Sequence, residues 1–372
     1  MQFIQTSKEN YLRNVRSRLA DIYTDNELEL NLQVDYGAAP SEIFRNFAMV
    51  EDIHELDKKE IYNYAIAIFG VLTDIKEENN NKSMTEALQV AFSFIEGYTK
   101  DSQTQVKLFT LLYNVFKQTD RYRYDIFCRL LSFCEENNCI VAVQSNLLII
   151  DQIANQWEIT KEERITLYKR IISILIEEEK LAAFELMLKT IKLFGNDEEL
   201  TTANKDLIIK TITLALEHPK LTQFEYLYNI AAVQILKSKK IEEKIIELVH
   251  IFAYEKLEDY TKWEESNKDY LEASGMESTI LKNKILYLSF FSLALKDRVI
   301  TFDKLAQTVG ISKDEIEEWV TDAIVNGIID ARIDQEEEQV IINTFAQRSS
   351  NLKERVEKTM EDFNSVLKKI DA

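Results

Sequence analysis

The sequence predicts a fold dominated by α-helices, in which an array of helical repeats leads into a small winged-helix domain and a last helix. Three observations support this prediction. The 372 residues include only 7 glycines and 2 prolines, far below the usual shares of about 7% and 5%. Apolar residues recur with a helical period almost throughout the chain. A single convincing hairpin pattern interrupts that period near the C-terminal end.

The composition favours helices with short connections. Hairpins and phosphate-binding loops use glycine because it adopts positive φ angles without strain. Hydrophobic residues make up 46% of the chain, which provides enough apolar surface for a core and excludes a disordered chain. The net charge of −19 repels polyanions and argues against a general affinity for DNA or RNA.

The cysteines and the N-terminal sequence predict a cytoplasmic protein. Cys128, Cys134 and Cys139 are odd in number and show no zinc-site spacing. We expect reduced thiols in a reducing compartment. The first residues lack the basic and then apolar layout of a signal peptide. No run approaches the ~18 apolar residues of a membrane span, so no membrane partner is expected.

From residue 105 onward the apolar positions form regular helical stripes. The stripes occupy residues 106–116, 126–134, 140–153, 165–175, 181–191, 208–216, 224–236 and 245–252. Gly195 and Pro219 mark the ends of two of the expected helices. Helix pairs therefore repeat about every 35–40 residues, the size of tetratricopeptide or HEAT units. Stacked pairs form a superhelix with a concave surface that binds other proteins.

The expected organisation has four parts. Residues 1–100 form a less regular helical region, part of which is expected to be mobile. Residues 101–275 form the helical-repeat array, and residues 276–345 form the winged-helix domain. Residues 346–372 form a C-terminal helix.

The winged-helix prediction depends on three helices followed by a hairpin. The helices are expected at residues 281–294, 303–309 and 312–326, and the hairpin strands at residues 328–333 and 339–343. A short apolar segment, residues 299–302, precedes the second helix. Ser312 and Glu315 have the spacing of a capping box, which marks the start of the third helix.

The last segment carries a heptad seam. Its apolar positions are spaced alternately by four and three residues, at Leu352, Val356, Thr359, Phe363, Val366 and Ile370. Such spacing predicts a helix that packs against other helices. The helix either joins helices of partner proteins or folds back on its own domain, and its length favours partners.

The sequence contains no recognisable catalytic, metal or cofactor motif. His54, His218 and His250 are far apart and show no metalloprotease spacing. The glycine patterns of nucleotide-binding loops and of serine hydrolases are missing. We therefore expect no catalytic residue, no metal and no cofactor. His250 lies in an apolar run and is expected to be a core or groove histidine.

The third helix of the winged-helix domain is too acidic to read DNA. It carries one basic residue, Lys313, against the carboxylates of Asp314, Glu315, Glu317, Glu318 and Asp322. Recognition helices need basic or amide side chains that face phosphates and base edges. Two basic spots, residues 121–124 and residues 237–240, are expected to be inter-helix loops. The first has the aromatic spacing of single-strand RNA contacts, yet we expect RNA contact to be indirect at most.

Helical repeats that run into a winged helix and a terminal helix resemble the PCI-domain family. Four segments carry the resemblance: residues 248–252, 267–271, 300–303 and 333–335. It is clear over residues 235–345, looser over residues 100–235, and slight before residue 100. Family members build the proteasome lid, the cullin-deneddylating signalosome and translation initiation factor 3.

The resemblance implies a non-catalytic scaffold subunit. It favours translation initiation factor 3, with assembly of the 43S pre-initiation complex and mRNA recruitment as the function. The signalosome or the proteasome lid is the alternative, and a nucleic-acid-binding winged helix is a second alternative. Implied partners are other PCI subunits and, through the complex, the small ribosomal subunit. In this family wing strands pair across subunits and terminal helices form a bundle. The expected wing edge consists of Val340, Ile341, Ile342 and Asn343.

Overall fold

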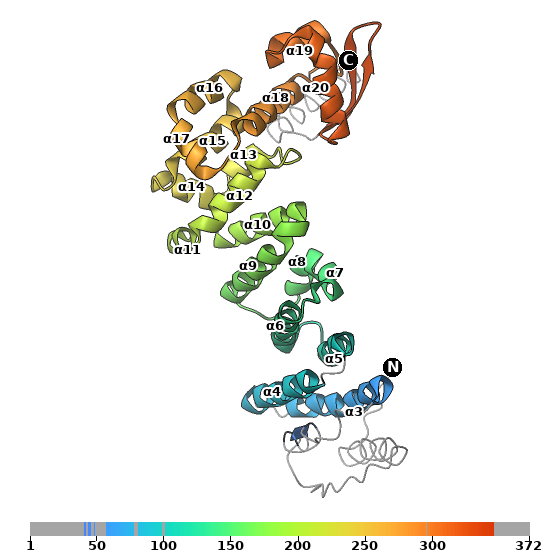
Figure 1. Ribbon diagram of the computed structural model, residues 1–372. Coiled ribbons are helices and arrows are strands. Elements are labelled where there is room, and N and C mark those ends of the chain that lie inside the picture. Colours follow the sequence, from blue (N-terminus) through green and yellow to red (C-terminus); the bar gives the residue numbers. More distant parts are fainter. Residues whose placement is uncertain are drawn as a thin grey trace, which may run out of the picture. The chain divides into compact units, whose positions relative to one another are not determined.

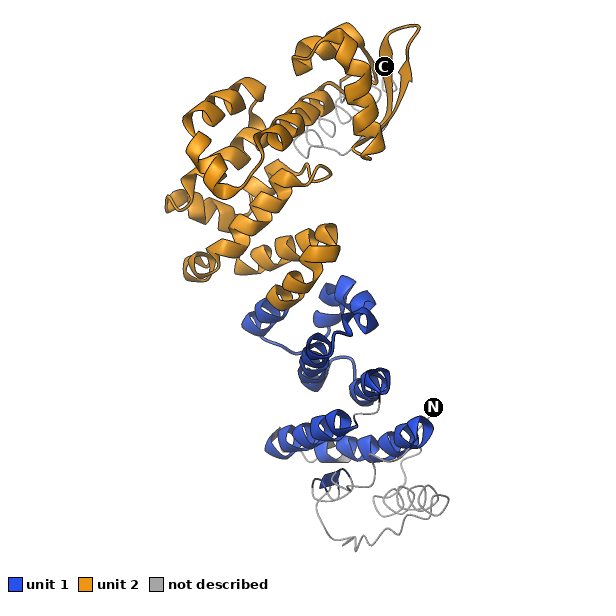
Figure 2. Cartoon of the chain, viewed as in Figure 1, with its two compact units in different colours: residues 1–167 blue, residues 168–372 orange. Residues whose placement is uncertain are grey.

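The computed structural model describes residues 41, 44, 45, 48, 57–77, 81–98, 101–294 and 296–345. The chain forms two compact units, Met1–Leu167 and Tyr168–Ala372, whose boundary lies within helix α9, Lys161–Glu178 (Figure 2). Helices dominate both units, and the strands lie near the C-terminal end of the second unit (Figure 1). The predicted helix-dominated fold with a winged helix is therefore confirmed.

The first unit is a succession of helices. They are α3 (Lys58–Glu77), α4 (Asn81–Gly97), α5 (Ser102–Val115), α6 (Arg121–Glu136), the 3-10 helix η2 (Ile140–Ala142), α7 (Gln144–Leu148), α8 (Ile150–Ala154) and the first part of α9. The stripe predicted over residues 126–134 is buried along α6. The single helix expected over residues 140–153 is instead three short turns. Val143, Leu147 and Ile150 are buried at the predicted spacing, whereas Val141, Leu148 and Ile149 are exposed. Apolar periodicity does not distinguish such short turns from one helix.

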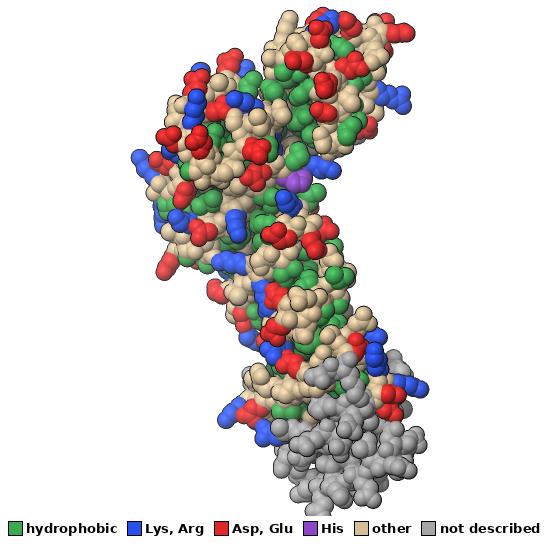
Figure 3. Space-filling model, viewed as in Figure 1, with side chains coloured by type: hydrophobic (Ala, Val, Ile, Leu, Met, Phe, Trp, Pro, Cys, Tyr) green, Lys and Arg blue, Asp and Glu red, His purple; other side chains and the backbone are tan. Residues whose placement is uncertain are grey.

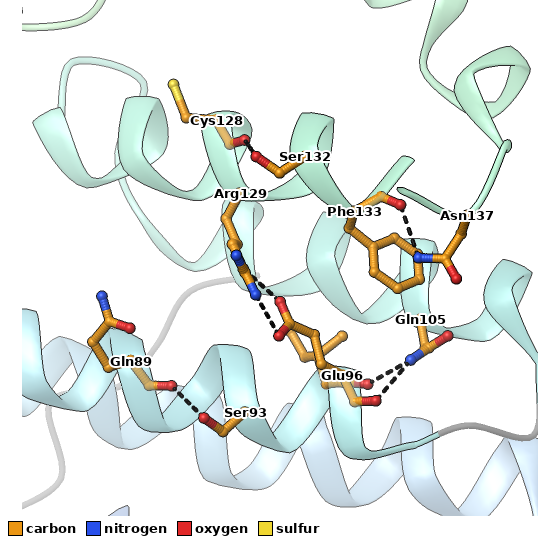
Figure 4. A network of polar contacts seen from close by, with 10 residues as sticks. Gln89, Ser93, Glu96, Gln105, Cys128, Arg129, Ser132, Phe133 and Asn137 are labelled. Carbon is orange, nitrogen blue, oxygen red and sulfur yellow. Dashed lines mark hydrogen bonds and ion pairs between the residues drawn. The ribbon is translucent and has the colours of Figure 1, made fainter. Parts of the chain in front are cut away.

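A polar network ties α4 to the two helices that follow it (Figure 4). The guanidinium of Arg129 on α6 donates from Nε to Glu96 Oε1 at 2.5 Å and also donates to Oε2. The buried amide of Gln105 on α5 donates to the carbonyl oxygens of Ile95 and Glu96, both at 3.1 Å. These carbonyls belong to the last turn of α4, where no intrahelical donor is left. Gln105 thus caps the end of α4 from a neighbouring helix.

The second unit continues the helical array. After α9 come α10 (Lys180–Phe194), α11 (Glu198–Ala203), α12 (Lys205–Glu217), α13 (Phe224–Tyr228), α14 (Ala231–Ser238), α15 (Glu243–Tyr254), α16 (Leu257–Ser266) and α17 (Lys268–Ser274). The helix α10 ends at Gly195, whose φ of 60° suits glycine.

The helix expected over residues 224–236 is divided into α13 and α14. Asn229 follows α13, and its side-chain amide donates to Glu225 O at 2.9 Å and to the Tyr254 hydroxyl at 2.7 Å. An asparagine that bonds the preceding turn competes with the backbone for its hydrogen bonds. Ile230 is then extended, and α14 starts anew.

A buried lysine joins the array to the winged-helix part. Lys284 lies on α18 (Ser278–Ala294) and is 3% exposed. Its ammonium donates to His218 O at 2.5 Å and to Ala215 O. Both carbonyls belong to the C-terminal end of α12, where the helix dipole favours a cation. Burial lowers the pKa of Lys284 well below its usual range.

The winged-helix part begins with α18. It continues with β1 (Val299–Thr301), α19 (Phe302–Val309), α20 (Lys313–Val325), β2 (Ile329–Asp334) and β3 (Gln339–Phe345). Ser312 and Glu315 form the predicted capping box at the start of α20. The ring of Trp319 on α20 stacks on Tyr287 of α18 with centroids 4.8 Å apart, and this contact holds the two helices together.

The three strands form one antiparallel sheet in the order β1-β3-β2. The prediction that Val340, Ile341, Ile342 and Asn343 form an unpaired edge is therefore wrong. Val340 and Ile341 are paired with both neighbours, and Ile342 N donates to Arg298 O at 2.9 Å beyond the start of β1. Asn343 lies past β1, and its side chain donates to Asp330 of β2 at 3.2 Å. The short β1 strand takes the place that a partner strand was expected to fill.

The predicted terminal seam lies outside the described residues. Leu352, Val356, Thr359, Phe363, Val366 and Ile370 all follow residue 345, where the description ends. Their role as a contact for partner helices stays a prediction. In the described part of the chain, no helix has the length and apolar character needed to span a membrane.

Candidate interaction surfaces

The outer side of β2 is an open sheet edge among the described residues. On β3, the backbone groups of even-numbered residues face β1, because Phe302 N donates to Glu338 O at 2.8 Å and Ile342 N donates to Arg298 O. The odd-numbered residues of β3 therefore face β2, since alternate residues point to opposite sides of a strand. With Arg332 opposite Ile341, the backbone groups of Ala331 and Ile333 point outward, where another strand could pair with them.

The face of α20 is acidic, as predicted. Lys313, the basic residue at its start, is held by Glu338 at 2.5 Å and by Asp303 at 3.1 Å. The ammonium is thus engaged by carboxylates of the wing turn and of α19. Acidic side chains are spread over the visible face of the winged-helix part (Figure 3). This arrangement repels a phosphate backbone, and it argues against DNA reading by α20.

The basic spot at residues 121–124 is occupied by contacts within the first unit. Arg121 pairs with Glu163 at 2.5 Å. Arg123 lies over the ring of Tyr113 at 4.4 Å, and its Nε donates to Phe116 O at 3.0 Å. The ring of Tyr124 packs against Trp157 with centroids 6.0 Å apart. These side chains serve the packing between helices. The prediction of an inter-helix loop is wrong here, because residues 121–124 form the first turn of α6.

A groove of about 440 Å³ runs along α15 in the second unit. Its floor is one face of the helix, formed by Glu243, Ile246, Glu247, His250 and Ile251. These positions are spaced by three and four residues, so their side chains lie on one side of the helix. Tyr228 of α13, Lys237 of α14 and Trp263 of α16 form its walls. We call this site the α15 groove.

Aromatic rings crowd one end of the α15 groove. The His250 ring lies 5.1 Å from Tyr228 and 5.3 Å from Tyr254 between centroids. Its Nδ1 is 3.3 Å from a carboxylate oxygen of Glu255. His250 is thus a partly exposed groove histidine, one of the two environments that the sequence predicted for it.

The second basic spot lies at the rim of this groove. Lys237 donates to the Tyr228 hydroxyl at 2.5 Å, and Lys239 pairs with Glu198 at 2.9 Å. Lys240 and Glu242 hold left-handed backbone conformations, with φ angles of 56° and 54°. Such angles are strained for residues with a side chain, and strained residues concentrate at binding sites. Periodicity did not reveal the groove, because its floor and walls come from four separate helices.

The titratable groups of the described residues show no arrangement typical of catalysis. Burial and a hydrogen bond with Cys139 raise the pKa of Cys134 to about 12, which keeps it a thiol and a poor nucleophile. Burial, together with nearby lysines, lowers the pKa of His218. In the part of the chain that the structure describes, no group of three or more His, Cys, Asp and Glu side chains is placed to hold a metal ion.

The C-terminal part of the chain matches a known protein family. The model of the PCI domain matches residues 257–344, which extend from α16 to β3. This match confirms the resemblance drawn from residues 267–271, 300–303 and 333–335.

Relatives of nearly the same length are similar along most of the chain. Subunit M of eukaryotic translation initiation factor 3 from Homo sapiens is 26% identical over 93% of this chain and 90% of its own length. The Dictyostelium discoideum subunit M is 26% identical over 79% of this chain and 73% of its length. The Nematostella vectensis subunit M is 22% identical over 82% and 81%.

The similarity extends farther than the sequence motifs indicated. An alignment that covers 93% of the chain includes most of the first hundred residues, where the motifs gave little. Residues 257–344 therefore match the PCI domain, and the chain is similar along most of its length to subunit M of eukaryotic translation initiation factor 3.

Proposed function

We propose that the chain is a non-catalytic scaffold subunit of translation initiation factor 3. The observation that carries this proposal is the similarity to subunit M over 90% of the human protein's length. A match of this extent covers the helical array and the PCI domain together. The proposed role is to support assembly of the 43S pre-initiation complex and mRNA recruitment to the small ribosomal subunit in the cytoplasm.

The architecture suits a scaffold. Stacked helix pairs offer long surfaces for other proteins, and a short sheet offers an edge for strand pairing. Wing pairing with a neighbouring PCI subunit would use the outer edge of β2, with Ala331 and Ile333 as the outward-facing residues. This replaces the edge predicted on β3, whose two sides are already occupied.

The acidic α20 argues against the nucleic-acid alternative. Because Lys313 is already paired with two carboxylates, a phosphate would have to displace them. We therefore propose that contacts with RNA and with the ribosome belong to the complex as a whole.

The heptad seam supplies a test of assembly. Replacing Leu352, Val356 and Phe363 by Asp places three charges in the apolar seam, and burying them in a helix bundle costs several kcal/mol. We expect the tagged full-length variant to lose the initiation factor 3 subunits that the wild-type chain co-precipitates. Far-ultraviolet circular dichroism should show that the variant stays helical.

A matched variant controls for added charge. Ser350, Asn364 and Ser365 replaced by Asp add the same charge outside the seam, and this variant should assemble as the wild type does. If the seam variant also assembles, the seam is not the anchor. If the wild-type chain recovers no initiation factor 3 subunit, the proposed function itself is wrong.

A further inference from the structure

The C-terminal end of α6 brings two cysteines together. Cys134 lies in the last turn of the helix, and Cys139 is the second residue after the cap, Asn137. The backbone N–H of Cys139 donates to Cys134 O at 2.9 Å. The N–H of Asn138 donates to Glu135 O at 3.4 Å. These two bonds make a Schellman motif, in which Asn138 adopts the left-handed conformation with a φ of 52°. In this motif the side chains at the positions of the two cysteines commonly touch.

The two residues are close enough for a disulfide. With standard backbone bond lengths, the hydrogen bond between them limits the separation of their Cα atoms to about 6.8 Å. A disulfide spans roughly 4.4–6.8 Å between Cα atoms. The two thiols are also hydrogen-bonded to each other, so both side chains point to the same place. Asn137 holds this end of the helix, because its side-chain amide donates to Phe133 O at 2.9 Å (Figure 4).

The two thiols differ in their access to solvent. Cys134 is fully buried, and Cys139 is partly exposed. A dissolved oxidant therefore reaches Cys139 first. Cys128, the third cysteine, is hydrogen-bonded to Tyr124. It lies six residues before Cys134 on α6, which is about 9 Å at the helical rise. Residues that far apart cannot be bridged without movement of the backbone, so Cys128 serves as an internal reference.

We propose that Cys134 and Cys139 form a reversible disulfide when hydrogen peroxide reaches the chain. The Cys139 thiolate first attacks one oxygen of the peroxide. The O–O bond breaks, Cys139 becomes a sulfenic acid, and the other oxygen leaves as water after it takes up a proton. The Cys134 sulfur then attacks the sulfenic sulfur. The S–S bond forms, the S–O bond breaks, and the hydroxyl leaves as water with the proton of Cys134. Both thiols are thus oxidised while the peroxide is reduced to water.

Contact between the sulfur atoms compensates for the low reactivity of Cys134. Burial raises the pKa of this thiol to about 12 and keeps it protonated. Its sulfur already lies beside the group that it attacks, and such intramolecular reactions run far faster than bimolecular ones. The disulfide binds the end of α6 to the start of η2, which follows Cys139 directly. A dithiol reductant reverses the bond by thiol–disulfide exchange. The inference does not depend on membership of translation initiation factor 3.

The test exposes the reduced full-length chain to hydrogen peroxide, alkylates the remaining thiols and digests the protein with trypsin. Cleavage after arginine and lysine leaves Cys134 and Cys139 together in residues 130–161, and Cys128 in residues 124–129. We expect the first peptide to carry no alkyl group and to lose the mass of two hydrogen atoms. Dithiothreitol added before alkylation should restore both alkyl groups. The second peptide should keep its alkyl group throughout.

Two variants and an unfolded control test the order of the steps. Cys134→Ala removes the second thiol, so the sulfenic acid of Cys139 should persist and be trapped by dimedone, which should find little of it in the wild type. Cys128→Ser lies outside the pair and should form the disulfide as the wild type does. The wild-type chain unfolded in urea should form the bond about tenfold more slowly, because the helix end that joins the thiols is lost.

Three results would overturn the proposal. Full alkylation of residues 130–161 at a peroxide dose that oxidises Cys128 would show that the pair does not react. Sulfinic acid at Cys139 beside an alkylated Cys134 would show that the two sulfur atoms are not placed to join. Equal rates of disulfide formation in the folded and the urea-unfolded chain would show that the fold contributes nothing.

Discussion

Replacing Lys284 by alanine is expected to lower the free energy of unfolding of the second unit by about 3–5 kcal/mol. The change removes a side chain that is 3% exposed and that caps two carbonyl groups at the end of α12. Two buried acceptors lose their donor, and a cavity forms between α12 and α18. Urea unfolding and amide hydrogen exchange of these two helices measure the effect.

Two further variants separate the possible causes. Lys284→Met keeps the apolar stem and removes only the donors, so about 1–3 kcal/mol should be lost. Asn283→Ala, on the same helix, changes an exposed side chain and should alter the free energy of unfolding by about 0.5 kcal/mol or less. A methionine variant as stable as the wild type would show that Lys284 is retained for packing alone.

Replacing Ala331 by proline is expected to weaken the proposed pairing of β2 with a neighbouring PCI subunit about tenfold or more. The backbone N–H of Ala331 points away from β3, so its loss breaks no hydrogen bond of this sheet. Proline is tolerated on edge strands and at bulges, and a register shift lies between Asp330 and Ala331. A partner strand would lose one donor and would meet the proline ring.

Co-expression with neighbouring subunits followed by affinity purification measures this effect. Ala331→Val keeps the N–H and favours a strand, so it should assemble normally. An Ala331→Pro chain that assembles as well as the wild type would show that the β2 edge is not an interface.

Local signals in the sequence were sufficient to predict many of the elements. The Ser312 and Glu315 capping box, the end of α10 at Gly195 and the buried stripe of α6 follow from neighbours within one or two turns. Such features depend on backbone hydrogen bonds and helix periodicity. Both are determined by residues that are close in the sequence, so a short stretch of sequence is enough to predict them.

The errors concern contacts between residues that are distant in the sequence. The strand β1 pairs with β3 some forty residues later, and three residues are too few to show a strand period. The wing edge was therefore placed on the wrong strand. Asn229, which follows α13, bonds the Glu225 carbonyl of that helix and the Tyr254 hydroxyl of α15. The apolar pattern shows neither contact, because both are polar.

The position of Lys284 in the sequence could have predicted that its side chain is buried. It lies on the same stripe as Leu281, Ile285 and Leu288, at spacings that place all four side chains on the buried face of α18. A lysine on an apolar stripe needs a partner. The sequence does not reveal that this partner is the end of α12, because the residues in contact are 69 and 66 positions apart along the chain.

The most direct test of the proposed function is purification of the chain from its native cells, followed by quantitative mass spectrometry. A scaffold subunit of translation initiation factor 3 should recover the other subunits of that factor in near-equal amounts, together with proteins of the small ribosomal subunit. Recovery of cullins and signalosome subunits, or of proteasome subunits, in place of initiation factor 3 would contradict the proposal.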